Sequence, residues 1–158
     1  MGKVVIRMNE KYIKQMKAGE ELDSLVASEV MNMFPCDKWE YMSLGTAGGP
    51  VFIKKCKHTN CYPKQYIESI HGRIGGLPQF SSRPIYALTV WQKIRDTNEF
   101  CCLNINSDYS YIYRIELIKE DLTGKSKHEP CVIVEDEDFC VAICKAALLG
   151  MNIINQNK

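Results

Sequence analysis

The sequence predicts an α+β domain: a three-stranded antiparallel meander flanked by helices, an α-β-α sandwich, with a Gly- and Cys-rich insert. Apolar residues recur at helical spacing near both ends of the chain, and strand-like segments joined by short connections lie between residues 100 and 134. Residues 36–82 hold six of the ten glycines. Such short connections leave no room for crossover helices, so the strands are expected to pair antiparallel. The 158 residues are predicted to form a single domain, 1–158, with the loop-rich insert 36–82 within it.

The first part of the chain is predicted to be helical. Residues 9–18 carry apolar side chains at helical spacing for a turn or two. A longer helix is predicted at 20–33, because Leu22, Leu25, Val26 and Val30 fall on one face. Acidic side chains in its first turn suit the positive end of the helix dipole.

The insert is predicted to be mostly loop. Two short strands are expected at 40–44 and 51–55, joined by the glycine-rich segment 45–50. A loop region this long in a compact domain is usually functional or disordered. Aromatic residues and cysteines in the insert favour a functional region.

The second half is predicted to contain a helix, three strands and a final helix. The helix covers 84–96, with Ser82 as its cap, and the strands cover 100–105, 109–117 and 131–134. The final helix begins at 139, after an expected cap at Asp136, and is expected to end at Gly150. Because Lys145 is its only charged residue, we expect this helix to be buried.

Charge and composition exclude several classes of protein. The formal net charge of +1 argues against a nucleic-acid polymer or an anionic membrane as a partner. Basic side chains are concentrated in 37–83, so a small anionic ligand would prefer this end of the chain. No apolar run reaches the ~18 residues of a membrane span, and the first residues do not resemble a secretory signal. We therefore expect a cytoplasmic protein whose eight cysteines are mostly reduced thiols.

Three segments resemble the phage ABA sandwich domain family. Residues 19–31 are similar to the opening helix of that family, Phe80-Ser81-Ser82 to the start of its middle helix, and residues 142–149 to its closing helix. The Cys-rich stretch 56–63 resembles an insert seen in some members. The resemblance implies a phage or prophage protein, acting in the cytoplasm of an infected bacterial host, with helices flanking a small sheet. It assigns no reaction, and Arg83 stands where the family usually has Asp.

A group of metal-ligating residues lies in the insert. Cys56, His58 and Cys61 occur within six residues, and Cys36 or His71 could supply a fourth ligand from the same region. Zinc is the metal that such a set suits, and a metal would hold together a segment with little core of its own. The alternative is that these are two partly buried thiols and a surface histidine.

Three loops of the same region predict an anion cradle. Glycines at 45, 48 and 49 could let backbone N–H groups close on an anion. The segment 45–49 is not a nucleotide-hydrolase loop, because it lacks the Gly-Lys-Ser/Thr ending of such loops and precedes a strand instead of a helix. A second loop carries Arg73, whose guanidinium can grip phosphate, and a third lies at the start of the helix at 84–96. The alternative is a hairpin turn, a linker and an ordinary helix cap. The predicted ligand-binding residues are Thr46, Gly48, Gly49, Lys54, His71, Arg73, Ser81, Ser82 and Arg83.

Catalysis is weakly supported, because the chain has only three histidines and no Gly-x-Ser-x-Gly motif. We therefore expect a small-ligand-binding protein, not an enzyme. Its predicted ligand is a nucleotide-derived host defence signal, either a cyclic nucleotide or an ADP-ribose derivative. The protein is expected to be a homo-oligomer that sequesters this ligand, with an aromatic side chain stacked on the base. One alternative is a protein–protein interaction module, zinc-stapled or not, that inhibits a host protein. A hydrolase of the same nucleotides is a second alternative.

Overall fold

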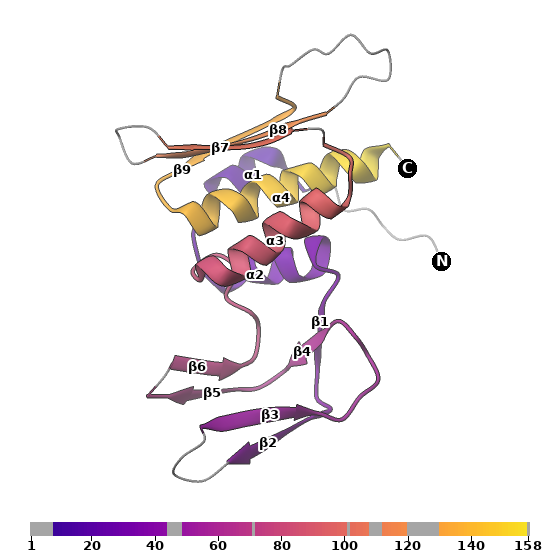
Figure 1. Ribbon diagram of the computed structural model, residues 1–158, viewed down its shortest axis with the longest axis vertical. Helices are drawn as coiled ribbons and strands as arrows, with labels where there is room; N and C mark the ends of the chain where they lie inside the picture. The colour runs from indigo at the N-terminus through magenta and orange to yellow at the C-terminus, as the bar shows by residue number, and fades with distance from the viewer. Residues whose placement is uncertain are drawn as a thin grey trace.

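The computed structural model describes residues 8–43, 49–70, 72–100, 102–107, 112–119 and 130–157. It confirms the predicted α+β class. Helices and a three-stranded sheet form one end of the molecule, which we call the frame, and six short strands form the other (Figure 1). The two ends are joined by the chain entering β1 and by the chain leaving β6.

The helices of the frame are α1 (Glu10–Gln15), α2 (Glu20–Leu25), α3 (Pro84–Asp96) and α4 (Phe139–Gln156). A π-helical turn, η1 (Val26–Val30), continues α2, so the helix predicted at 20–33 ends three residues early. Helix α3 has the predicted bounds. Its N-cap is Arg83, not Ser82, and no side chain caps it.

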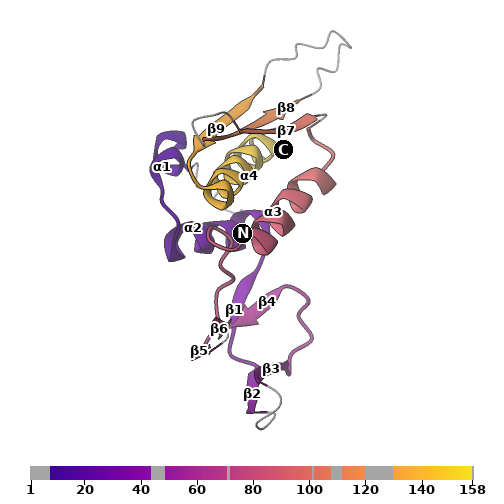
Figure 2. The ribbon, with the colours of Figure 1, turned by 60° about the vertical axis from the view of Figure 1, so that its left-hand side comes forward.

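The sheet of the frame contains β7 (Cys102–Ser107), β8 (Tyr113–Ile118) and β9 (Val132–Asp136). Strand β8 is central and pairs antiparallel with both neighbours. Helix α4 lies between this sheet and the other helices (Figure 2). Its side chains Ile143, Cys144 and Leu148 are fully buried, as the apolar composition of the segment predicts.

Helix α4 begins and ends at other residues than predicted. Asp138, not Asp136, caps it, because its carboxylate accepts hydrogen bonds from the backbone N–H groups of Cys140 and Val141. The helix passes through Gly150 and ends at Gln156. A β-carbon at Gly150 would lie 2.8 Å from Leu117 Cδ1 on β8 and 3.3 Å from the Phe100 ring. Glycine is therefore present for close packing, and not as a helix stop.

With its full length, α4 is the one helix among the described residues that is long and apolar enough to cross a membrane. However, 67% of it is buried inside the protein. The core helix of a soluble protein is buried in the same way, and the structure is compatible with a soluble protein.

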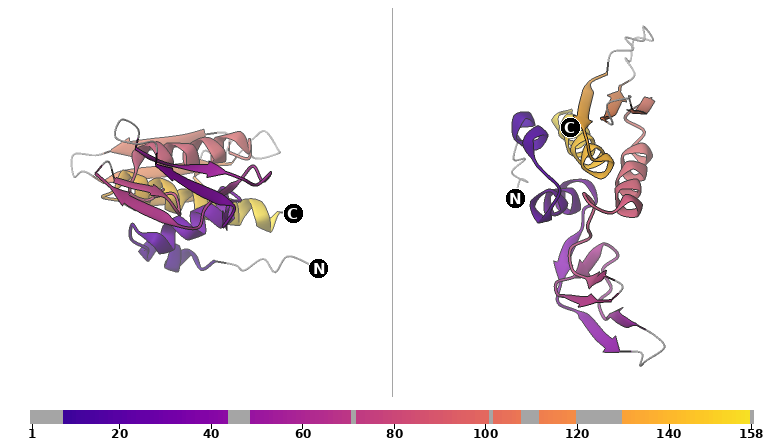
Figure 3. Two further views of the ribbon diagram at one scale, coloured as in Figure 1. Left: turned by 90° about the horizontal axis from the view of Figure 1, so that it is seen from below. Right: turned by 90° about the vertical axis from the view of Figure 1, so that its left-hand side faces the viewer.

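The other end of the molecule, residues 34–79, is here called the insert lobe. It contains β1 (Phe34–Cys36), β2 (Trp39–Ser43), β3 (Pro50–Lys54), β4 (Cys61–Pro63), β5 (Tyr66–Ser69) and β6 (Gly72–Gly75). Strands β1 and β4 pair parallel, and β2–β3 and β5–β6 are antiparallel hairpins. Figure 3 shows these strands grouped beyond α2 and α3. No strand was predicted in the insert after residue 55, whereas β4, β5 and β6 lie there, separated by loops.

The insert lobe has almost no hydrophobic interior. The buried core of the protein draws on residues 13–30 and 80–154. Among the described side chains from 31 to 79, the only buried ones are those of Cys36, Cys61 and Pro63. The centre of the lobe is therefore made of two thiols and one proline ring.

Candidate metal centre and ligand cleft

Three cysteines of the insert lobe come together. Their Sγ atoms, on Cys36, Cys56 and Cys61, all lie within 4.8 Å of one another. The pairing of β1 with β4 places Phe34 opposite Cys61, so Cys36, two residues after Phe34, lies on the same face as Cys61. Cys56 follows β3, and its Sγ lies 3.4 Å from that of Cys61. All three are free thiols.

The three thiols differ in acidity. Burial on its own would raise the pKa of Cys56. Hydrogen bonding from Cys61, from the His58 backbone and from Cys36 outweighs burial, and the charge of Lys54 acts in the same direction. The pKa of Cys56 is therefore lowered. Burial, and then the adjacent Cys56, raise the pKa of the Cys61 thiol. Cys56 is therefore the first of the pair to become a thiolate, which accepts a hydrogen bond from Cys61.

The Trp39 indole lies beside the same thiols. Its Nε1 is buried and forms no hydrogen bond with any described residue. The N–H is close enough to Cys61 to favour the thiolate, although it does not form a hydrogen bond with it. Burial has the larger effect, so the pKa of Cys61 stays raised. Sequence reasoning missed this role, because no spacing pattern places Trp39 beside the cysteines.

His58, the fourth predicted ligand, does not belong to this cluster. Its exposed ring packs edge-on against Phe34, with 5.1 Å between ring centroids. His71, the other histidine considered, lies outside the described residues. The structure therefore brings together three of the four predicted metal ligands.

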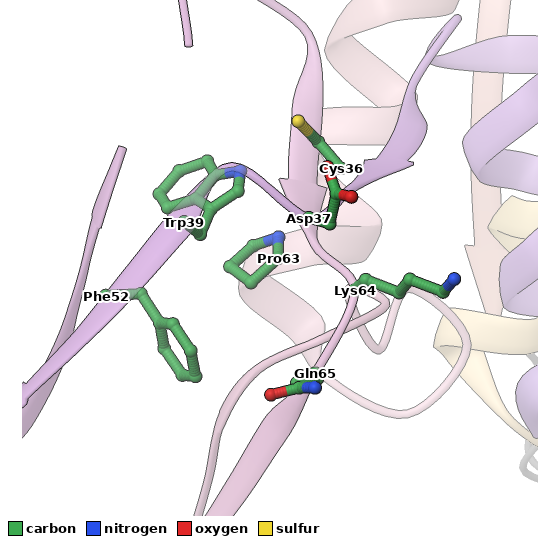
Figure 4. Close-up of a pocket in the computed structure, with 7 residues that line it drawn as sticks. All are labelled: Cys36, Asp37, Trp39, Phe52, Pro63, Lys64 and Gln65. Atoms are coloured by element: carbon green, nitrogen blue, oxygen red, sulfur yellow. The ribbon is translucent and has the colours of Figure 1, made fainter. Parts of the chain in front are cut away.

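Two hollows adjoin the thiols. The smaller, of about 100 Å³, is bordered by Cys36 and Trp39 at one end and by Phe52 and Gln65 at the other (Figure 4). The larger is a cleft of about 240 Å³ between the insert lobe and the start of α3. Trp39 and Pro63 line both hollows. The residues that line the cleft are Trp39, Cys61, Tyr62, Pro63, Arg73, Gly75, Gly76, Leu77, Pro78, Gln79 and Tyr86.

Arg73 is the one cation among the residues lining the cleft. Its guanidinium carbon lies 4.0 Å from the centre of the Tyr66 ring, a cation–π contact. A β-carbon at Gly76 would lie 2.8 Å from Arg73 Nη2, so this glycine makes room for the guanidinium. Arg73 Nε is buried and has no hydrogen-bond partner among the described residues.

The other predicted cations do not line this cleft. Lys54 Nζ lies 5.9 Å from the centre of the Trp39 ring. The Arg83 guanidinium lies against Gly72, where a β-carbon would be 2.9 Å from its Nη2. Of the three predicted cations, only Arg73 therefore lines this cleft, and the two arginines contact different neighbours.

Ser81 has a structural role in the described conformation. It is fully buried, its backbone N–H donates to Asp23 Oδ1 at 2.6 Å, and its Oγ accepts from the Gly19 N–H at 3.0 Å. These bonds connect the chain leaving the insert lobe to the start of α2. Ser81 is therefore not available to a ligand, whereas Ser82 is exposed but does not line the cleft. Gly49 has open space around it, and Thr46 and Gly48 lie outside the described residues.

No family model, no curated protein and no solved structure matches this chain. The similarity to the phage ABA sandwich domain family therefore stays a prediction.

Proposed function

We propose that this chain is a binding protein that holds a small anionic ligand in the cleft at Arg73 and does not turn it over. The observation that carries the proposal is Arg73 Nε, a buried N–H donor without an acceptor among the described residues. Buried polar groups are nearly always hydrogen-bonded, so an unpaired one at a cleft favours a ligand that supplies the acceptor. A guanidinium matches the paired oxygens of a phosphate or carboxylate.

The size and lining of the cleft narrow the ligand class. Its volume of about 240 Å³ is just below the ~300 Å³ at which ordinary small-molecule sites begin. It suits a phosphate with one base and one sugar better than a dinucleotide or a polymer. Tyr62, Tyr86 and Trp39 offer aromatic faces on which a base can stack.

Within the predicted class of nucleotide-derived host defence signals, a cyclic mononucleotide therefore fits better than an ADP-ribose derivative, which has two phosphates and two riboses. Among the described residues that line the cleft there is no carboxylate or imidazole to act as a general base. This favours sequestration over hydrolysis. The phage origin and the homo-oligomer remain parts of the same proposal.

Isothermal titration calorimetry with cyclic mononucleotides, ADP-ribose and inorganic phosphate tests this function. We expect saturable binding of a cyclic mononucleotide that Arg73→Lys weakens about tenfold, the loss of one hydrogen bond to a charged group. Arg95→Lys, on the exposed last turn of α3, is the matched control and should bind normally. The ligand should be recovered intact after denaturation. Absence of heat with every compound, on folded protein, would contradict the proposal.

A second candidate function, docking on a host protein, is favoured by the β2–β3 hairpin. Tyr41, Met42 and Ile53 on this hairpin are exposed. Exposed apolar side chains on a projecting hairpin are a typical feature of interaction surfaces. A pull-down from bacterial lysate that yields one protein, and that Tyr41→Ser with Met42→Ser abolishes, would support it. Ile85→Ser, at an exposed apolar residue of α3, is the control and should not affect the pull-down.

A further inference from the structure

We propose that Cys36, Cys56 and Cys61 bind one Zn²⁺ as thiolates, and that the imidazole of His58 supplies the fourth ligand. The proposal concerns how the insert lobe is held together. It does not depend on what the neighbouring cleft binds.

The positions of the sulfur atoms fit a tetrahedral zinc. Zn–S bonds of about 2.3 Å place two sulfurs of one tetrahedron about 3.8 Å apart. The three Sγ atoms lie within 4.8 Å of one another, and the Cys56–Cys61 pair is 3.4 Å apart. Adjustments of a few tenths of an ångström to about one ångström therefore suffice. Thiols still protonated would release their protons to solvent as the metal binds.

His58 is the one histidine among the described residues, and it lies close to the cluster along the chain. It follows Cys56 by two residues, and its backbone N–H is close enough to that sulfur to help lower the pKa of Cys56. Its ring packs on Phe34, which lies directly opposite Cys61 in the β1–β4 pair. To bind the metal, the imidazole would leave Phe34 and turn toward the cluster.

Trp39 provides an independent observation. Groups that donate hydrogen bonds to metal ligands orient those ligands and tune the metal. The buried, unpaired indole N–H beside Cys61 is placed to donate to a metal-bound thiolate. A bound zinc keeps that thiolate negatively charged, so the donor gains the acceptor that the described residues do not give it.

The architecture of the insert lobe supplies the reason for a metal. Its three pairs of strands have three to five residues a strand, and isolated two-stranded hairpins are marginal in water. The only buried side chains among those described in it are two of the three thiols and the ring of Pro63. Zinc at the thiols would join β1, β4 and the end of β3, which is the role of structural zinc in small domains.

A disulfide between Cys56 and Cys61 is the competing reading of the short sulfur–sulfur distance. It would leave Cys36 as a third thiol in the same place without a function. It would also leave the Trp39 N–H without a charged acceptor. Three converging sulfurs with a donor beside them are better explained by a metal.

The test is the zinc content of protein expressed in medium supplemented with zinc and purified without a metal-affinity tag or chelator. We expect one zinc per chain by elemental analysis, lost in Cys36→Ser and in Cys56→Ser. Cys131→Ser, at an exposed thiol on the frame, is the matched control and should keep the zinc. If the Cys→Ser variants fold poorly, wild-type protein stripped of metal and titrated with Co²⁺ should develop the visible bands of a tetrahedral sulfur-rich site.

Two further variants test the remaining ligand and the donor. His58→Ala should shift the cobalt bands and weaken zinc binding, and Trp39→Phe should weaken it about tenfold, as for other groups that support ligands. An unchanged cobalt spectrum and affinity in His58→Ala would overturn the assignment of the fourth ligand. The whole site would be overturned by a zinc content far below one per chain in reduced folded protein. It would also be overturned by a disulfide, seen as a mass two hydrogens short in the fragment with Cys56 and Cys61. A calorimetric failure at the cleft with zinc present would count only against the proposed function.

Discussion

Lys145 and Asp136 form an ion pair inside the protein, with 2.7 Å between Nζ and Oδ2, and the lysine side chain is only 5% exposed. The same ammonium donates to the backbone carbonyl of Lys14 at 3.0 Å. One charged residue on the core helix thus connects α4 to β9 and to α1. This explains how the otherwise apolar helix accommodates a lysine.

Asp136→Asn is expected to destabilise the protein by about 3 kcal/mol, because it leaves a buried ammonium without its counter-charge. Lys145→Met should cost less, since it removes the buried charge together with the bond. Urea unfolding measures both. The exposed Lys55–Glu40 pair is the control, and Glu40→Gln should change stability by less than about 1 kcal/mol. A greater loss in Lys145→Met than in Asp136→Asn would contradict this account.

Gly150→Ala should destabilise the protein by about 1 kcal/mol. The change gains about 1 kcal/mol of helix propensity, but it places a methyl group 2.8 Å from Leu117 Cδ1, and overpacking a core costs about 1–3 kcal/mol. Thermal or urea unfolding gives the difference. Leu117→Val in the same chain should recover part of the loss, and a stabilised Gly150→Ala protein would show that Gly150 was only a poor helix former.

Asp23 gives the stability of the fold a pH dependence. Burial raises the pKa of this carboxyl above its ordinary value of 3.8, although hydrogen bonds from Ser81 and the charge of Arg73 oppose the rise. Glu20 adds to it. Because the folded state holds the proton more tightly, the contribution of Asp23 to stability is complete below pH 3.8 and is lost as the pH rises through the folded pKa.

We therefore expect Asp23→Asn to remove this loss, since the amide oxygen can still accept from the Ser81 N–H. Urea unfolding from pH 3.5 to 7 measures the effect. Wild type should lose stability relative to Asp23→Asn as the pH rises. A difference that stays constant, or that has the opposite slope, would mean that the carboxylate is stabilised by its partners.

The spacing of apolar residues correctly predicted two of the helices, because that spacing directly reflects which side of a helix is buried. The spacing of Ala87, Val90 and Ile94 gave α3 its correct bounds, and the apolar run at 139–150 correctly predicted a buried helix. The stop at Gly150 was wrong because the reason for glycine lies on β8, far along the chain. Strands β4, β5 and β6 were missed because segments of three or four residues are too short to show a period.

The same distinction applies to the candidate site. Cys56 and Cys61 were recognisable by their spacing, whereas the approach of Cys36 depends on the parallel pairing of β1 with β4. The roles of Trp39 and Gly76 could not be predicted, because each depends on a side-chain contact that residue spacing does not show: a thiol for the indole and a guanidinium for the glycine. Arg83 and Lys54 were grouped with Arg73 by charge alone, and the charge of a residue does not determine where its side chain points.

Gly76→Ala should impair ligand binding at the cleft. The residue has φ of +69°, and a methyl group would lie 2.8 Å from Arg73 Nη2 and 2.9 Å from Tyr66 Cβ. We expect weaker binding, by tenfold or more, because the guanidinium must leave its place. Gly72→Ala is the matched control: its φ of +100° is also unfavourable, but the methyl group would meet Arg83, which does not line the cleft. Equal losses in both variants, measured by calorimetry, would indicate general damage to β6.

Removal of zinc should loosen the insert lobe and leave the frame intact. The frame has its own core around α4, whereas the lobe has only thiols and Pro63 buried at its centre. Hydrogen exchange followed by mass spectrometry, with and without a zinc chelator, measures the two parts separately. Peptides from 34–43 and 61–69 should exchange faster in chelator, because the β1–β4 pair and its neighbours lose the ion that connects them. Peptides from 140–154 should be unchanged, and Cys131→Ser protein should respond as wild type does. Equal acceleration in α4 would show that the lobe and the frame unfold as one unit, and no acceleration in the lobe would show that the strands hold together without a metal.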